Sequence, residues 1–153
     1  MRFQVLIAGL MALVPSLASA ADAVTISKGD GVVEFKVNGA VVSRYHVGEK
    51  VAKPYLWPML APNGAAVTRS WPMTDAKAGE TTDHVHQKSA WFCHGDVIPE
   101  GLELKTKTLD KTGKGVDFWS EGKDKDGNPR HGRIVVTKVG EPKQVSENHA
   151  SIT

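Results

Sequence analysis

The sequence has little of what marks several common protein classes. A single cysteine among 153 residues excludes an internal disulfide framework. Charge of one sign is also lacking, since 19 Lys and Arg stand against 17 Asp and Glu, for a formal net charge of +2. Without a basic stripe, nucleic acid is not an expected partner. Beyond the N-terminus, charges or prolines interrupt every apolar stretch, so stable membrane insertion is not expected either.

The first twenty residues have the pattern of a secretory signal peptide. Arg2 supplies the positive charge, and residues 5–14 form an apolar run. Such a run is well short of the roughly 20 apolar residues that a spanning helix needs. Ala18-Ser19-Ala20 gives the small-x-small pattern of a cleavage site. We therefore predict export to a periplasm or beyond, with residues 21–153 forming the mature domain.

Apolar residues in the mature chain alternate with a period of two. Val33, Phe35 and Val37 share one face, and Asn38-Gly39 follows as a favoured type I′ hairpin turn. Because no stretch carries a helical stripe, we predict an all-β fold, an antiparallel β-sandwich. The further predicted strands are 41–47, 55–60, 66–70, 102–109, 116–120 and 133–139, with turns at Asn63-Gly64 and Asp126-Gly127-Asn128.

The polar groups that can do chemistry lie between residues 53 and 119, among tryptophans. In a strand, His84 and His86 would point to one face with Cα atoms roughly 6.5 Å apart, and His94 has the same parity. Three neutral imidazoles with an open position would suit zinc, iron or copper. Alternatively, the histidines hydrogen-bond backbone or substrate hydroxyls without a metal.

Aromatic residues beside Arg, Asp and His also predict a carbohydrate pocket. Sugar rings present apolar C–H faces that stack on indoles, while their hydroxyls need directional partners. Trp71 or Trp91 would be the platform, with Arg69, Asp96 and the histidines as hydrogen-bonding groups. Paired carboxylates for glycoside hydrolysis are a further option, and the candidates are Asp83, Asp96, Asp117 and Glu121.

Several blocks of this sequence, in order over roughly residues 25 to 140, resemble the N-terminal half of the PmoA-like family. Two departures are Val85 in place of a proline and Gln87 in place of a third histidine. The blocks are Lys53-Pro54-Tyr55-Leu56-Trp57-Pro58, Pro62-Asn63-Gly64, Val67-Thr68-Arg69, Asp83-His84-Val85-His86, Trp91-Phe92-Cys93-His94-Gly95-Asp96-Val97 and Asp117-Phe118-Trp119.

The resemblance implies an exported protein of uncertain activity with an all-β sandwich related to the galactose-mutarotase-like supersandwich. It also implies a connection with carbohydrate metabolism. The family label of methane oxygenase does not fit, because the membrane subunit of that name has several spanning helices. Family members run to nearly twice this length, so the chain is either a truncated reading frame or completes itself by self-association.

Three functional hypotheses follow. The first is a carbohydrate-binding or carbohydrate-active protein, with a mutarotase-, lyase- or hydrolase-like reaction. The second is a metal-dependent oxidoreductase with a divalent transition metal, either cupin-like or of the kind that the family label suggests. The third is a non-catalytic binding module or incomplete half-domain. The first assigns catalysis to His84, His86 and Asp96 and substrate binding to Arg69, Trp71, Trp91, His94 and Trp119, whereas the second makes His84, His86 and His94 metal ligands.

Overall fold

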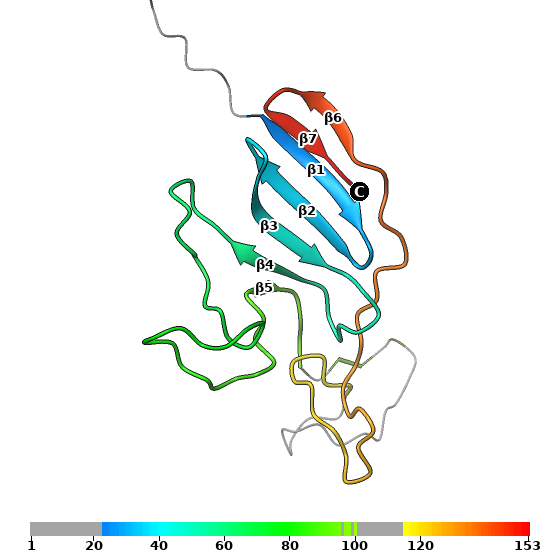
Figure 1. The fold of residues 1–153 in the computed structure, drawn as a ribbon. Coiled ribbons are helices and arrows are strands. Elements are labelled where there is room, and N and C mark those ends of the chain that lie inside the picture. The colour runs from blue at the N-terminus through cyan, green and yellow to red at the C-terminus, as the bar shows by residue number, and fades with distance from the viewer. Residues whose placement is uncertain (1–22, 96, 99, 101–114) are drawn as a thin grey trace, which may run out of the picture.

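The computed structural model describes residues 23–95, 97, 98, 100 and 115–153, and these residues form strands and no helix (Figure 1). Five antiparallel strands follow one another across the main sheet in sequence order. The predicted all-β class is confirmed. The strands of this sheet are β1 (Val24–Gly29), β2 (Val32–Val37), β3 (Ala40–His46), β4 (Tyr55–Met59) and β5 (Ala90–Trp91).

A second, two-stranded sheet joins β6 (Lys143–Ser146) to β7 (His149–Ser151) and lies beside β1 (Figure 1). The Val24 amide donates to the Glu147 carbonyl at 2.8 Å, and the Gln144 side-chain amide donates to the Val24 carbonyl at 2.9 Å. This hairpin therefore covers the edge that β1 would otherwise expose. Because the two sheets meet edge to edge, the predicted sandwich remains a prediction.

The β2–β3 hairpin has the turn that its sequence predicts. Asn38 and Gly39 adopt φ angles of 50° and 80°, as a type I′ turn requires. The register pairs Val33 with Tyr45 and Glu34 with Arg44. Apolar residues thus gather on one face of the sheet, and charged residues gather on the other.

The predicted turn at Asn63-Gly64 also forms, but no strand follows it. The Gly64 amide donates to the Ala61 carbonyl at 2.8 Å, and Gly64 has a φ of 80°. Leu60 and Ala66 then make an isolated bridge. The prediction of a strand over 66–70 is wrong because the chain leaves the sheet edge there and enters a loop.

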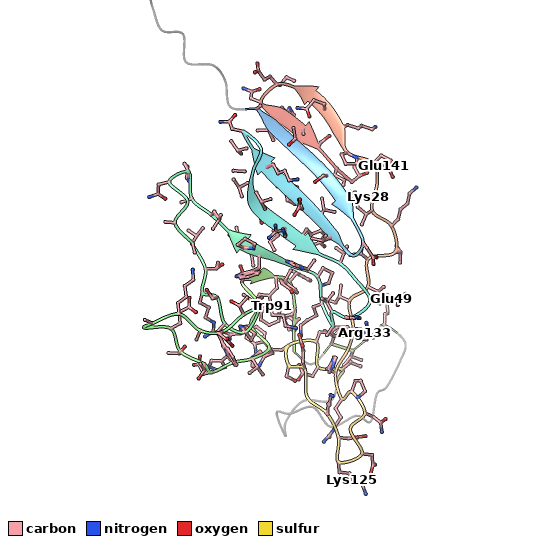
Figure 2. All side chains as sticks on the ribbon, in the orientation of Figure 1. Lys28, Glu49, Trp91, Lys125, Arg133 and Glu141 are labelled. Carbon is pink, nitrogen blue, oxygen red and sulfur yellow. The ribbon has the colours of Figure 1, made fainter. Side chains whose placement is uncertain are left out.

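Two later strand predictions are also wrong. Within 116–120 only Val116 pairs, in an isolated bridge with Val97, because the Asp117 side chain turns the backbone that follows it. The segment 133–139 contains no strand. Arg133 donates instead to the Glu49 carbonyl, and that contact, together with the Lys28–Glu141 ion pair, ties this part of the chain to the sheet (Figure 2). The predicted strand 102–109 lies outside the described residues.

The two faces of the sheet differ in chemistry. Val33 is buried, with 1% exposure, on the apolar face. A groove of about 430 Å³ opens near the β5 end of the sheet, lined by Tyr45, Pro54, Leu56, Ala90, Trp91, Phe92 and Ile134. On the opposite face the His46 and Tyr55 rings stack at 4.5 Å. The described part of the chain holds no helix long and apolar enough to cross a membrane.

The close approach of two turns provides a test of this packing. A Cβ on Gly31 would lie 2.9 Å from the Gly48 Cα, whereas one on Gly39 would meet nothing within 4 Å. Both glycines have positive φ, at 67° and 80°. Gly39→Ala should therefore lower the free energy of unfolding by about 1–2 kcal/mol. Gly31→Ala should cost about 1–3 kcal/mol more because of the added clash. Urea denaturation measures both losses, and equal losses would contradict the described approach.

Candidate functional site

Four of the predicted site residues meet beside β5, and we call His84, His86, Trp91 and Trp119 the aromatic cluster. The Trp91 and Trp119 ring centroids lie 5.3 Å apart and are tilted by 56°. The His86 ring lies 6.3 Å from Trp91 and 6.1 Å from Trp119, and His84 meets His86 at 5.6 Å. Figure 2 labels Trp91 where the loop before β5 and the segment after residue 115 come together.

His86 is the central member of the aromatic cluster. Its Nε2 atom is buried and has no hydrogen-bond partner among the described residues. Burial lowers the pKa of the imidazole, and the nearby His84 and Lys53 lower it further. The neutral ring is therefore favoured, and it keeps one polar atom unsatisfied.

A turn, rather than a strand, brings His84 and His86 together. His84 has a φ of 44°, and its carbonyl accepts the Gln87 amide at 2.9 Å. The prediction that the two histidines share a strand face is wrong. Their rings nevertheless meet in a T-shaped contact, with an interplanar angle of 83°, because the turn folds one back toward the other.

Arg69 and Trp71 brace this turn from outside the aromatic cluster. One Arg69 nitrogen donates to the Asp83 carboxylate at 2.8 Å, and the other donates to the carbonyls of Asp83 and His84, both at 3.2 Å. The Trp71 indole donates to the Asp83 carbonyl at 3.1 Å. Hydrogen bonds from Thr81 and Arg69 lower the pKa of Asp83. The polar atoms of Arg69 and Trp71 are thus used within the loop, and the prediction that they bind substrate remains untested.

Glu80 is a structural residue that the sequence interpretation missed. Its carboxylate accepts the backbone amides of Ser70 at 2.7 Å, Trp71 at 3.3 Å and Lys77 at 3.1 Å. These bonds, the one from Ser70 above all, lower the pKa of Glu80. No local motif indicates this role, because the acceptor and two of its donors are about ten residues apart.

Lys53, also missed, is a buried cation beneath the aromatic cluster. Its side chain is only 2% exposed. Nζ lies 3.1 Å from the Trp119 carbonyl, 3.3 Å from the Ser120 carbonyl and 3.5 Å from Glu121 Oε1. It also lies 5.1 Å from the Trp91 ring centroid. Burial lowers the pKa of the ammonium, and the charge of Glu121 opposes that shift.

Glu121 links Lys53 to a second lysine. Lys88 Nζ lies 3.0 and 2.9 Å from the two Glu121 oxygens, and 5.7 Å from the Tyr55 ring centroid. Glu121 was a candidate for hydrolytic chemistry. In the structure its carboxylate is engaged by two cations.

Asp117 is committed to the local backbone in a similar way. The residue is 7% exposed, and its carboxylate accepts hydrogen bonds from the Trp119 amide at 2.7 Å, the Ser120 amide at 3.2 Å and the Ser120 hydroxyl. Burial raises the pKa of Asp117, but the hydrogen bonds from Ser120 and Trp119 outweigh it and hold the pKa below its usual value. This turn therefore holds the backbone of Trp119.

His94 does not join the aromatic cluster. His94 is exposed, and its ring bonds to the neighbouring Gly95 carbonyl. Asp96 lies outside the described residues. Burial raises the pKa of the Cys93 thiol. In the part of the chain that the structure describes, no three His, Cys, Asp or Glu side chains are grouped so as to hold a metal ion.

A comparison with known families identifies the family of this chain. Residues 32–152 match a family of unknown function, DUF6807. The chain belongs to that family. No curated protein and no solved structure matches the chain. The resemblance to the PmoA-like family stays a prediction.

The Asp117 turn yields a prediction with a defined pH dependence. Asp117→Ala leaves buried donors unsatisfied, so it should lower the free energy of unfolding by about 1–3 kcal/mol at pH 7. Because the pKa is lowered in the folded state, the carboxylate stabilises the fold above its usual value of 3.8, and this contribution disappears as pH falls through the folded-state pKa. The difference from wild type should therefore shrink in acid. Urea denaturation of the wild type and the variant, at pH 7 and in acid, measures this difference.

Asp75, an exposed aspartate, is the control for this prediction. Asp75→Ala should change the free energy of unfolding little at either pH. A loss as large as that of Asp117→Ala would mean that the Asp117 hydrogen bonds are not the cause.

Proposed function

We propose that this member of the DUF6807 family binds a carbohydrate at the aromatic cluster. The observation that supports the proposal is the pair of tilted indoles, one of them exposed, beside a buried imidazole nitrogen without a partner. Apolar ring faces and a directional polar atom are the two elements that sugar recognition requires.

Trp119 provides the accessible face. Its side chain is 46% exposed, although large aromatic rings are usually buried. The ring is held in place because its own backbone is bonded to Asp117 and Lys53. A fixed, exposed indole loses little conformational entropy when a sugar stacks on it, which favours affinity.

His86 provides the directional polar atom. An unsatisfied buried nitrogen costs about 1–3 kcal/mol. A ligand hydroxyl that hydrogen-bonds to Nε2 recovers this cost, and because Nε2 is buried, the atom must become accessible before that bond forms. The sugar is thus recognised by stacking first and by a hydrogen bond to His86 second.

The surrounding carboxylates favour binding over glycoside hydrolysis. Hydrolysis uses one carboxylic acid and one free carboxylate flanking the bond. Asp117 accepts three hydrogen bonds, and Glu121 pairs with two lysines. Acid–base catalysis by His84, His86 and Asp96 remains a prediction, since Asp96 lies outside the described residues.

We also propose that the protein is exported and acts outside the cytoplasm. The proposal rests on the N-terminal sequence, in which Ala18-Ser19-Ala20 follows an apolar run. Exported carbohydrate-binding proteins meet glycans there, which is consistent with the proposed ligand.

Binding to the aromatic cluster is tested with calorimetry against a panel of neutral and acidic oligosaccharides. For a glycan that the wild type binds, Trp119→Ala and His86→Ala should each weaken affinity by about tenfold or more, equivalent to about 1.4 kcal/mol. Val135→Ala is the control and should leave the affinity unchanged, because Val135 is 64% exposed and lies outside both the aromatic cluster and the groove that Trp91 lines. Unchanged affinity in both cluster variants, with their folds intact, would place the binding site elsewhere.

Export is tested by expressing the full chain in a bacterium with a periplasm. Cleavage after Ala20 should give a mature protein whose N-terminal sequence begins at Ala21. Replacing Ala18 and Ala20 with larger residues should block processing and retain the precursor. A secreted protein that begins at any other residue would refute the assigned boundary.

A further inference from the structure

A buried cation beneath the aromatic cluster needs an explanation, because removing an ammonium from water is costly unless it is fully bonded. Lys53 lies just before β4, and its side chain is 2% exposed. An ammonium has three N–H donors. Three consecutive residues supply acceptors for it, namely the carbonyls of Trp119 and Ser120 and the Glu121 carboxylate.

These contacts join Lys53 to Trp119 and Ser120, which lie 66 and 67 positions further along the chain. The segment 117–121 belongs to no strand, so the ladder of the main sheet does not fix its position. The Asp117 hydrogen bonds give the segment its local shape, because all of them fall within three residues. They do not set its distance from β5. The Phe118 amide donates to the His94 carbonyl at 3.0 Å, which ties the segment to the chain after β5. Lys53 adds a contact at the Trp119 carbonyl itself, and its Nζ also lies 5.1 Å from the Trp91 ring centroid.

We infer that Lys53 is a positioning residue that holds the Trp119 indole against Trp91 and His86. It acts through the Trp119 carbonyl and does not touch the ligand, because its donors are used and its side chain is buried. The consequence for binding rests on the proposed function, whereas the consequence for ring geometry does not.

Lys88 offers a matched comparison within the same network. It pairs with Glu121 at 2.9 Å, as Lys53 does at 3.5 Å, and it also lies over an aromatic ring. Among the described residues, its side chain contacts Glu121 and Tyr55 and does not bond to the backbone of Trp119 or Ser120. Removing Lys88 therefore removes a similar charge and leaves the Trp119 tether intact.

The experiment measures the ring pair directly. Two indoles 5.3 Å apart couple electronically and give an exciton couplet in the circular dichroism spectrum. Trp119→Phe should abolish this couplet and so identify it. Lys53→Met and the milder Lys53→Gln should keep the β-sheet spectrum and lose most of the couplet, whereas Lys88→Met should retain it.

Ligand affinity provides the second measurement. For an oligosaccharide that the wild type binds, Lys53→Met should weaken affinity about tenfold, and Lys88→Met should leave it within about twofold. If the wild type binds no oligosaccharide, the proposed function fails, and the couplet alone decides the role of Lys53.

Three outcomes would overturn the inference. One is a wild-type couplet in either folded Lys53 variant. Another is a couplet that survives Trp119→Phe, because the indoles would then not be paired in solution. The last is failure of both Lys53 variants to fold while Lys88→Met folds, which would make Lys53 a folding residue and not a positioning residue.

Discussion

The arrangement of the candidate site depends on one buried ammonium. Lys53 Nζ bonds to the carbonyls of Trp119 and Ser120 and pairs with Glu121, so it joins the end of the main sheet to a segment without regular secondary structure. In the apolar surroundings of Trp91 such bonds are stronger than in water, and an unpaired charge there would be costly. The site is therefore held by polar contacts, since Val33 is the one hydrophobic side chain that is fully buried in the described part of the chain.

The loop between β4 and β5 is organised by the same principle on a smaller scale. Arg69 donates hydrogen bonds to the carboxylate and the carbonyl of Asp83, and the Glu80 carboxylate accepts hydrogen bonds from three backbone amides. In each case a charged side chain bonds to backbone groups that, in a strand, would pair with a neighbouring strand. The positive φ of His84 is tolerated because Arg69 bonds to its carbonyl as well. Two residues predicted to bind a ligand, Arg69 and Trp71, thus support the turn that carries His84.

Local sequence patterns predicted the first half of the fold well. The period-two alternation over 33–37 and the Asn38-Gly39 turn depend on neighbouring residues only, and both are confirmed. The same reasoning failed at 66–70 and 133–139, where alternation occurs without a partner strand. A strand exists only when another strand accepts its hydrogen bonds, and no local pattern contains that information.

The sequence by itself determined the all-β class, the hairpin turn and the gathering of histidines and tryptophans in one region. It did so because turn chemistry and side-chain alternation act over a few residues. Only the tertiary structure decided that His86 contacts both Trp91 and Trp119, that His94 lies outside this cluster, and that Lys53 lies close to the Trp91 ring. Those contacts join residues tens of positions apart, and their geometry depends on how the loops pack against the sheet.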